Sequence, residues 1–175
     1  MTLGSDAAGG GDAGIEIHRA FDAPRDLIFR IWTDPRYVAL WWGVEGATNP
    51  TCQMDVRPGG KWRIDMRTAS GVLYPNAGEY LDVVPNERLV YTDVPVASSP
   101  AWHGSPPGVA VHTVTFEDEG DRTGVTLHVR FSTVVDRDRL AARGYKDGLG
   151  QAFDRVERLI AATSSGGSEA EAGAG

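Results

Sequence analysis

The sequence predicts an α+β fold in which a curved antiparallel β-sheet wraps around one long C-terminal helix. Two patterns carry this prediction. Apolar residues alternate with period two through six segments between residues 51 and 131, and they recur at helical spacing over residues 136–162. Short turns join the six segments, as antiparallel neighbours allow. The apolar face of such a sheet must be covered, and the C-terminal helix is the available cover.

The residues before the sheet predict one strand and two short helices. Residues 15–21 (IEIHRAF) alternate as a strand does, and the chain then enters a helix with Asp22 as a candidate N-cap. Asp34 and Pro35 end this helix and start a second one, which closes at Gly43. The full predicted order is strand, helix, helix, six strands and helix.

Two tryptophans, Trp41 and Trp42, stand side by side in the second helix. Neighbours on a helix point about 100° apart, so both rings cannot face the core in the same way. One ring is therefore expected in the core. The other either covers a surface seam or lines the wall of a cavity, where an indole face can stack on an aromatic ligand.

Three hairpins make up the six-strand run. The first spans residues 51–68 and turns at 58–60, the second turns at 85–86, and the third turns at 119–121. Strand alternation predicts which side chains face inward. They are Trp62, Ile64, Met66, Tyr91, His112, Val114, Phe116 and Phe131.

The C-terminal helical pattern contains glycines at 144, 148 and 150. Each glycine costs about 1 kcal/mol relative to alanine in a helix interior. They indicate either a helix break near 144–148 or space beside Tyr145 and Leu149 for a bound molecule. The apolar stripe of this helix consists of Tyr145, Leu149, Phe153, Val156 and Ile160.

Length and composition predict one folded domain, residues 15–162, between two disordered tails. Residues 1–14 and 163–175 are dominated by Gly, Ala, Ser and acidic residues, which bury too little apolar area to offset the entropy of ordering. The formal net charge is −7 and no basic patch is present, so nucleic acid is not an expected partner.

Several absences narrow the function class. Cys52 is the single cysteine, and no apolar run approaches 18 residues, which favours a cytoplasmic protein without a membrane span. The four histidines lack metal-ligand spacing, and no nucleophile elbow, P-loop or dinucleotide motif occurs. We therefore expect no metal and no cofactor, and we expect a monomer.

The order of elements and six stretches of sequence resemble the START-like superfamily, also called SRPBCC or Bet v 1-like, which has a helix-grip fold. The motifs are similar to its branch named after the activator of the heat-shock-protein-90 ATPase. The stretches are FDAPRDLIFRIWTDP, WWG, DVRPGGKWRI, GEYLDVVPNERLVYT, RTGVTLHVRF and the terminal amphipathic helix. The resemblance covers about residues 15–162.

This resemblance implies an internal apolar cavity between the sheet and the last helix, used to hold lipids, polyketides or other hydrophobic molecules. Members of the branch include cyclases, carriers, chaperone activators and proteins that protect producers from their own antibiotics. The sequence departs from the family at one point. The usual Gly-Trp pair of the last helix is replaced by GLGQAF (148–153), and the missing Trp either enlarges the cavity or changes its shape.

Loop 95–108 is long and contains four prolines, which is typical of a functional or disordered segment. By analogy with the fold, it lies at the cavity entrance beside residues 68–78. Tyr74, Trp102 and His103 would then form a lid. The alternative is that Trp102 packs back onto the sheet.

Polar side chains at inward-facing positions are the informative ones. His112 alternates with Val114 and Phe116, and a buried imidazole must form hydrogen bonds, either with protein or with a ligand. The phenol of Tyr91, if buried, must likewise form a hydrogen bond with protein or with a ligand. Asp93, on the face of Tyr91, is the best candidate for a buried carboxylate with a raised pKa.

The patterns and the resemblance together define one predicted ligand-binding set. Its members are Trp41, Trp42, Trp62, Ile64, Met66, Tyr74, Tyr91, Trp102, His112, Val114, Phe116, Phe131, Tyr145, Leu149 and Phe153.

Three functional hypotheses follow. The first is a protein that binds a hydrophobic, aromatic or polyketide-like small molecule, with a narrower role in sequestration or antibiotic self-resistance that rests on the resemblance alone. The second is a cofactor-independent cyclase or hydrolase using His112, Asp93 or Tyr91 in the same cavity. The third is an interaction module that stimulates a chaperone ATPase, supported only by the name of the branch. Because no catalytic set is evident, binding is favoured over catalysis.

Overall fold

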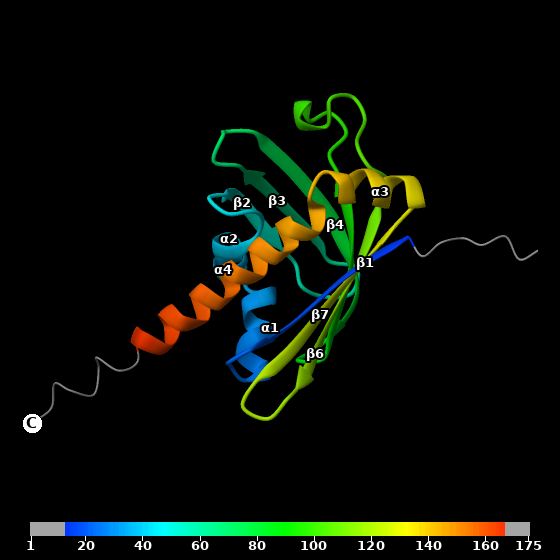
Figure 1. The fold of residues 1–175 in the computed structure, drawn as a ribbon. Helices are drawn as coiled ribbons and strands as arrows, with labels where there is room; N and C mark the ends of the chain where they lie inside the picture. Colours follow the sequence, from blue (N-terminus) through cyan, green and yellow to red (C-terminus); the bar gives the residue numbers. More distant parts are fainter. Residues whose placement is uncertain (1–12, 167–175) are drawn as a thin grey trace, which may run out of the picture.

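The computed structural model describes residues 13–166, and within this range seven antiparallel strands form one curved sheet. The strand order is β1-β7-β6-β5-β4-β3-β2, and α4 lies across the sheet (Figure 1). The predicted α+β helix-grip architecture is confirmed. The elements are β1 (Gly14–Phe21), α1 (Arg25–Thr33), α2 (Pro35–Trp41), β2 (Thr48–Met54), β3 (Lys61–Arg67), β4 (Leu73–Val84), β5 (Arg88–Pro95), the 3-10 turn η1 (Pro100–Trp102), β6 (Ala110–Asp118), β7 (Thr123–Phe131), α3 (Val134–Ala142) and α4 (Tyr145–Gly166).

The two short helices start differently from one another. As predicted, Asp34 begins α2, and its side chain accepts a hydrogen bond from the backbone N–H of Arg36. The prediction that Asp22 caps α1 is wrong, because Pro24 holds the N-cap position and Asp22 lies two residues earlier. Its carboxylate instead pairs with the guanidinium of Arg122, at 2.7 Å.

The segment predicted as one helix over residues 136–162 forms two helices, α3 and α4. The break falls at Arg143 and Gly144, and Gly144 has φ +78°, a left-handed conformation that favours glycine. The predicted helix break near residues 144–148 is therefore confirmed. Helix α4 continues to Gly166, and β1 begins at Gly14. The predicted tails otherwise lie outside the described residues.

The three predicted hairpins form, and their register places the expected side chains inward. Trp62 pairs with Gly78 across β3 and β4. A side chain at Gly78 would collide with the Trp62 indole, whose Nε1 donates a hydrogen bond to the carbonyl of Thr92 at 3.1 Å. On the neighbouring pair, Tyr91 lies directly opposite His112.

One end of the concave face is filled by a cluster of aromatic rings. Trp32 from α1 contacts Phe21, Phe116 and Phe153, with ring centroids 5.7–5.8 Å apart. Val156 of α4, which is completely buried, belongs to the same core. This solid end leaves the other end of the face, near the start of α4, to form the candidate site.

Candidate ligand-binding cavity

A cavity of about 330 Å³ lies between the sheet and the first half of α4. The end of α2, the loop that contains η1, and α3 complete its wall. The predicted ligand-binding residues that border it are Trp41, Trp42, Met66, Tyr74, Tyr91, Trp102, His112, Phe131, Tyr145, Leu149 and Phe153. Arg143, whose side chain is exposed, also borders it, so the cavity reaches the surface where α3 meets α4.

Four predicted members of the site do not border this cavity: Trp62, Ile64, Val114 and Phe116. They share the inward face of the sheet, as predicted. Val114 and Phe116, however, pack in the core, and the cavity occupies only one end of the face. Alternation along a strand identifies the face of a residue but not the part of that face that stays unfilled.

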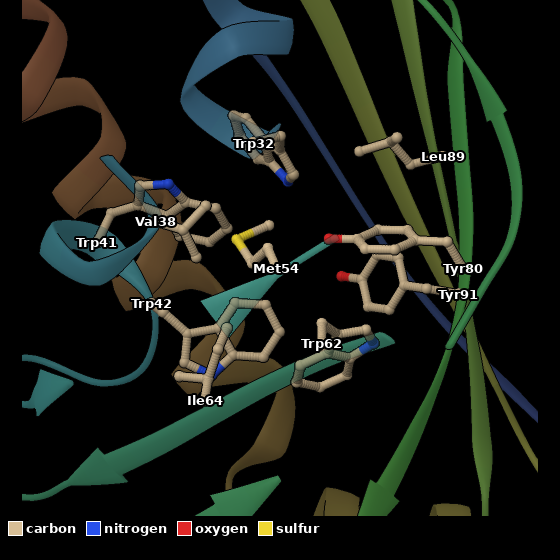
Figure 2. Close-up of a pocket in the computed structure, with 10 residues that line it drawn as sticks. All are labelled: Trp32, Val38, Trp41, Trp42, Met54, Trp62, Ile64, Tyr80, Leu89 and Tyr91. Atoms are coloured by element: carbon tan, nitrogen blue, oxygen red, sulfur yellow. The ribbon is translucent and has the colours of Figure 1, made fainter. Parts of the chain in front are cut away.

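Trp62 and Ile64 border a second, much smaller cavity, shown in Figure 2. Its volume is about 10 Å³, close to the minimum needed for one water molecule. Figure 2 shows the phenol oxygens of Tyr80 and Tyr91 directed toward Met54. This space is too small for an organic ligand.

The neighbouring indoles of Trp41 and Trp42 both lie at the wall of the larger cavity. Trp41 is buried, and its Nε1 donates a hydrogen bond to the carbonyl of Ile31 at 2.9 Å. Trp42 is half-buried and packs against Trp62, with ring centroids 5.6 Å apart. Because both rings border the cavity, Trp41 combines a core role with a wall role.

The loop before β6 partly matches the predicted lid. Trp102 packs edge-on against Tyr74, with ring centroids 5.4 Å apart, and both border the cavity. Ser99 fastens this loop to β4 by donating a hydrogen bond to the carbonyl of Leu73. The inclusion of His103 is wrong, because it is exposed in a left-handed turn after η1 and does not border the cavity.

A polar corner, formed by Asp93 of β5 and His112 of β6, interrupts the apolar wall. His112 Nε2 lies 3.7 Å from Asp93 Oδ2, which is too long for a hydrogen bond. Burial lowers the pKa of His112 to about 3 and raises the pKa of Asp93 to about 7. Both groups are thus driven toward their neutral forms, and the short distance does not make them an ion pair.

The phenols around this corner are also held neutral. Burial raises the pKa of Tyr91 well above its usual value, and the same cause raises the pKa of Tyr145. Asp93 adds to both shifts by charge repulsion. At neutral pH the two phenols and His112 are therefore neutral, whereas Asp93, with a pKa of about 7, is divided between its neutral and ionised forms.

One structural residue of the site was missed by the sequence reasoning. The guanidinium of Arg155, on α4, donates hydrogen bonds to the carbonyls of Leu40, Trp42, Val44 and Ala47 at 2.8–3.1 Å. These bonds hold the loop that carries Trp42 against α4. The partners are more than 100 residues apart in sequence, so no local pattern identifies them.

Other wall residues were also missed, namely Trp32, Leu127, Leu140 and Ala152. They come from α1, β7, α3 and α4, and each has an ordinary core pattern in the sequence. Between residues 13 and 166, no group of three or more His, Cys, Asp or Glu side chains is arranged to hold a metal ion. No helix in the described part of the chain is long and apolar enough to cross a membrane.

Comparison with solved structures supports the fold over most of the chain. A protein from Nitrosomonas europaea has a TM-score of 0.76 at 22% identity, covering 87% of this chain and 97% of its own. A protein from Mycobacterium smegmatis has the same TM-score and identity, covering 87% and 93%. One from Arthrobacter aurescens has a TM-score of 0.75 at 24% identity, covering 86% and 87%. At these identities the likeness shows the fold alone.

A search of curated proteins found no match. The family model described as "Activator of Hsp90 ATPase homolog 1-like protein" matches residues 22–161, which include α1, α2, six strands, α3 and most of α4. The chain therefore belongs to the activator of Hsp90 ATPase homolog 1-like family, whose fold generally binds hydrophobic ligands.

Proposed function

We propose that this protein binds and sequesters a small aromatic molecule of two or three fused rings in the cavity between the sheet and α4. The observation that carries the proposal is a cavity of about 330 Å³ with a wall made mostly of aromatic and aliphatic side chains. Ligand sites in proteins are typically concave, largely apolar and about 300–1,000 Å³ in volume.

The volume sets the size of the ligand. An apolar cavity of about 150 Å³ can hold one benzene ring. A cavity roughly twice as large suits two or three fused rings, such as part of the ring system of an aromatic polyketide.

The wall favours flat aromatic ligands over flexible chains. Tyr91, Phe131 and Tyr145 come from β5, β7 and α4, Trp42 directly follows α2, and all four border the cavity. Aromatic rings prefer offset or edge-to-face partners, with centroids about 4.5–7 Å apart. A fused-ring ligand offers both a face and an edge to such a wall.

Tryptophan fluorescence and calorimetry test this proposal. Anthracene should quench the protein's tryptophan fluorescence saturably at one site per chain, and naphthalene should bind in calorimetry. The control is Ala152→Phe, which places a ring in the cavity from α4, where Ala152 forms part of the wall. This variant should fold and lose binding, and Leu149→Trp serves as a second blocking variant.

Failure of a broad panel of two-ring and three-ring aromatics to bind saturably would overturn the proposal. Undiminished binding by both blocking variants would also overturn it, because the ligand would then lie elsewhere.

A second candidate function is acid–base catalysis on the bound molecule. It is favoured by one observation: Asp93, with a pKa of about 7, borders the cavity beside His112. General acids and bases work best when their pKa lies near the working pH. This candidate predicts a cyclase or hydrolase activity that depends on pH and disappears in His112→Ala, whereas pure sequestration predicts no turnover.

A further inference from the structure

The polar corner of Asp93 and His112 lacks internal partners. His112 is 3% exposed, and within residues 13–166 neither of its ring nitrogens has a hydrogen-bonding partner. In the same range, Asp93 Oδ1 is also buried without a partner. Nearly all buried polar groups in native proteins are hydrogen-bonded, so a cluster of unpartnered atoms on a cavity wall indicates a place for a ligand atom.

The surrounding packing prevents Asp93 and His112 from forming a hydrogen bond with each other. His112 stacks on Tyr91 with ring centroids 4.9 Å apart and an interplanar angle of 28°, and the two residues are paired across β5 and β6. Asp93 lies two residues after Tyr91 on β5 and pairs with Ala110. The sheet therefore holds the carboxylate and the imidazole side by side but 3.7 Å apart.

We propose that Asp93 and His112 bind a hydroxyl group of the ligand, so that the molecule held in the cavity is a phenol with two or three fused rings. This inference rests on the proposed function and specifies the chemical class of its ligand. One ligand oxygen would lie between His112 Nε2 and the Asp93 carboxyl group, accepting a hydrogen bond from the imidazole and donating one to the carboxylate.

The distance between the two groups suits this arrangement. His112 Nε2 and Asp93 Oδ2 are 3.7 Å apart, which is too far for a direct hydrogen bond. A single ligand oxygen can nevertheless lie about 2.8 Å from both atoms. Burial keeps His112 neutral, with a pKa of about 3, so its ring has one N–H donor and one acceptor.

Other ligand groups fit the corner less well. An ether or ketone oxygen can bond both groups only while Asp93 is protonated, because it cannot donate to the ionised carboxylate. An ammonium group would bring a positive charge and further N–H donors into a mostly apolar cavity. A carboxylate on the ligand would meet the like charge of ionised Asp93. A hydroxyl group combines a donor and an acceptor in one atom.

Three matched probes test the inference by calorimetry: naphthalene, 2-naphthol and 2-methoxynaphthalene. In the wild type, 2-naphthol should bind about tenfold or more tightly than the other two, because a site built to bond a hydroxyl discriminates against analogues that lack it. In His112→Phe and in Asp93→Leu this preference should fall below about threefold. In each protein the affinity for 2-naphthol is compared with the affinity of that same protein for naphthalene, so a general change in the cavity wall does not count as loss of the hydroxyl site.

The outcomes separate this inference from the proposed function. If naphthalene binds and 2-naphthol is not preferred, the hydroxyl site is overturned and the proposed function stands. If none of the probes binds, both are overturned. The two variants act at different residues, and each replaces a buried polar side chain with an apolar one of similar shape, so at least one should fold, as thermal unfolding will show.

Discussion

The two halves of α4 face two different interiors. In its C-terminal half, Val156 and Ile160 pack into a continuous core. Phe153 lies between the two interiors, because its ring contacts Phe21 and Trp32 and also borders the cavity. In its N-terminal half, Tyr145, Gly148, Leu149 and Ala152 border the cavity. The same helix crosses the same sheet face in both halves.

The difference lies in the size and polarity of the side chains. Gly148 and Ala152 contribute almost no volume, whereas Phe153 fills the space beside them. On the sheet, opposite the N-terminal half of α4, the cavity wall contains Asp93 and His112, whose polar atoms an apolar core would exclude. Small residues at one end of a helix and polar residues opposite them can thus leave a ligand cavity without changing the fold.

The sharpest test of this difference is to remove one aromatic ring from the core and one from the cavity wall, and to compare the two losses of stability. Phe21→Ala should lower the free energy of unfolding by about 3–5 kcal/mol, because Phe21 is fully surrounded in the solid half. Phe131→Ala should lower it by about half as much, because the Phe131 ring already borders empty space. Urea unfolding at pH 7 measures both values. Equal losses would show that the two halves are packed alike.

The second test uses the pH dependence of stability. Burial lowers the pKa of His112 from 6.5 to about 3, so below pH 6.5 the unfolded chain binds a proton that the folded chain does not. His112 therefore lowers the free energy of unfolding as the pH falls from 6.5 to 3. Burial raises the pKa of Asp93 from 3.8 to about 7, so Asp93 lowers it as the pH rises from 3.8 to 7.

In the wild type these two effects oppose each other between about pH 4 and 6.5. Relative to the wild type, Asp93→Asn should gain stability as the pH rises through this range, and His112→Phe should gain it as the pH falls. Each slope should approach about 1.4 kcal/mol per pH unit. Urea unfolding across the range measures the differences, and profiles parallel to the wild type would contradict the burial of the polar corner.

The third test concerns the loop after α2 that carries Trp42 and that Arg155 holds against α4. Arg155→Ala should lower the free energy of unfolding by about 2–3 kcal/mol and weaken aromatic binding, because four carbonyl groups lose a charged donor. The matched control is Arg158→Ala, one turn along α4. Its guanidinium forms an exposed pair with Glu45, worth about 0–1 kcal/mol. Similar effects of the two substitutions would show that the loop does not depend on Arg155.

The smallest expected effects come from two glycines near the start of α4. Gly144→Ala should lower the free energy of unfolding by about 1–2 kcal/mol, because φ at Gly144 is +78°. Gly150→Ala should raise it by about 0.5–1 kcal/mol, because Gly150 is helical and an added Cβ meets no atom within 4 Å. Thermal unfolding compares the two variants, and a shift of the same sign in both would contradict the assigned helix break.

Much of the fold follows from local patterns. Period-two alternation predicted the three hairpins and the inward placement of His112, Val114 and Phe116. Helical spacing predicted the buried stripe of α4 but extended it across Gly144, because a periodic pattern continues through a residue whose backbone turns. The short helix α3 was consequently merged with α4.

The candidate site was only partly predictable. The inward face was predictable, and it supplied Tyr91, His112 and Phe131. The solid end of that face was not predictable, and the predicted members Val114 and Phe116 lie there and do not border the larger cavity. Arg155 was missed, because its carbonyl partners reach it only after the chain has folded.

Local patterns in the sequence were enough to predict the strands, most of the helices and the side chains that face inward, because these depend on the order of apolar, polar and turn residues along the chain. The filled and hollow parts of the interior become evident only in the folded chain, since the free volume is set by side chains that meet from distant segments. The same reason applies to the polar corner. Asp93 and His112 lie on different strands, and the pairing of those strands determines both their separation and their lack of internal partners.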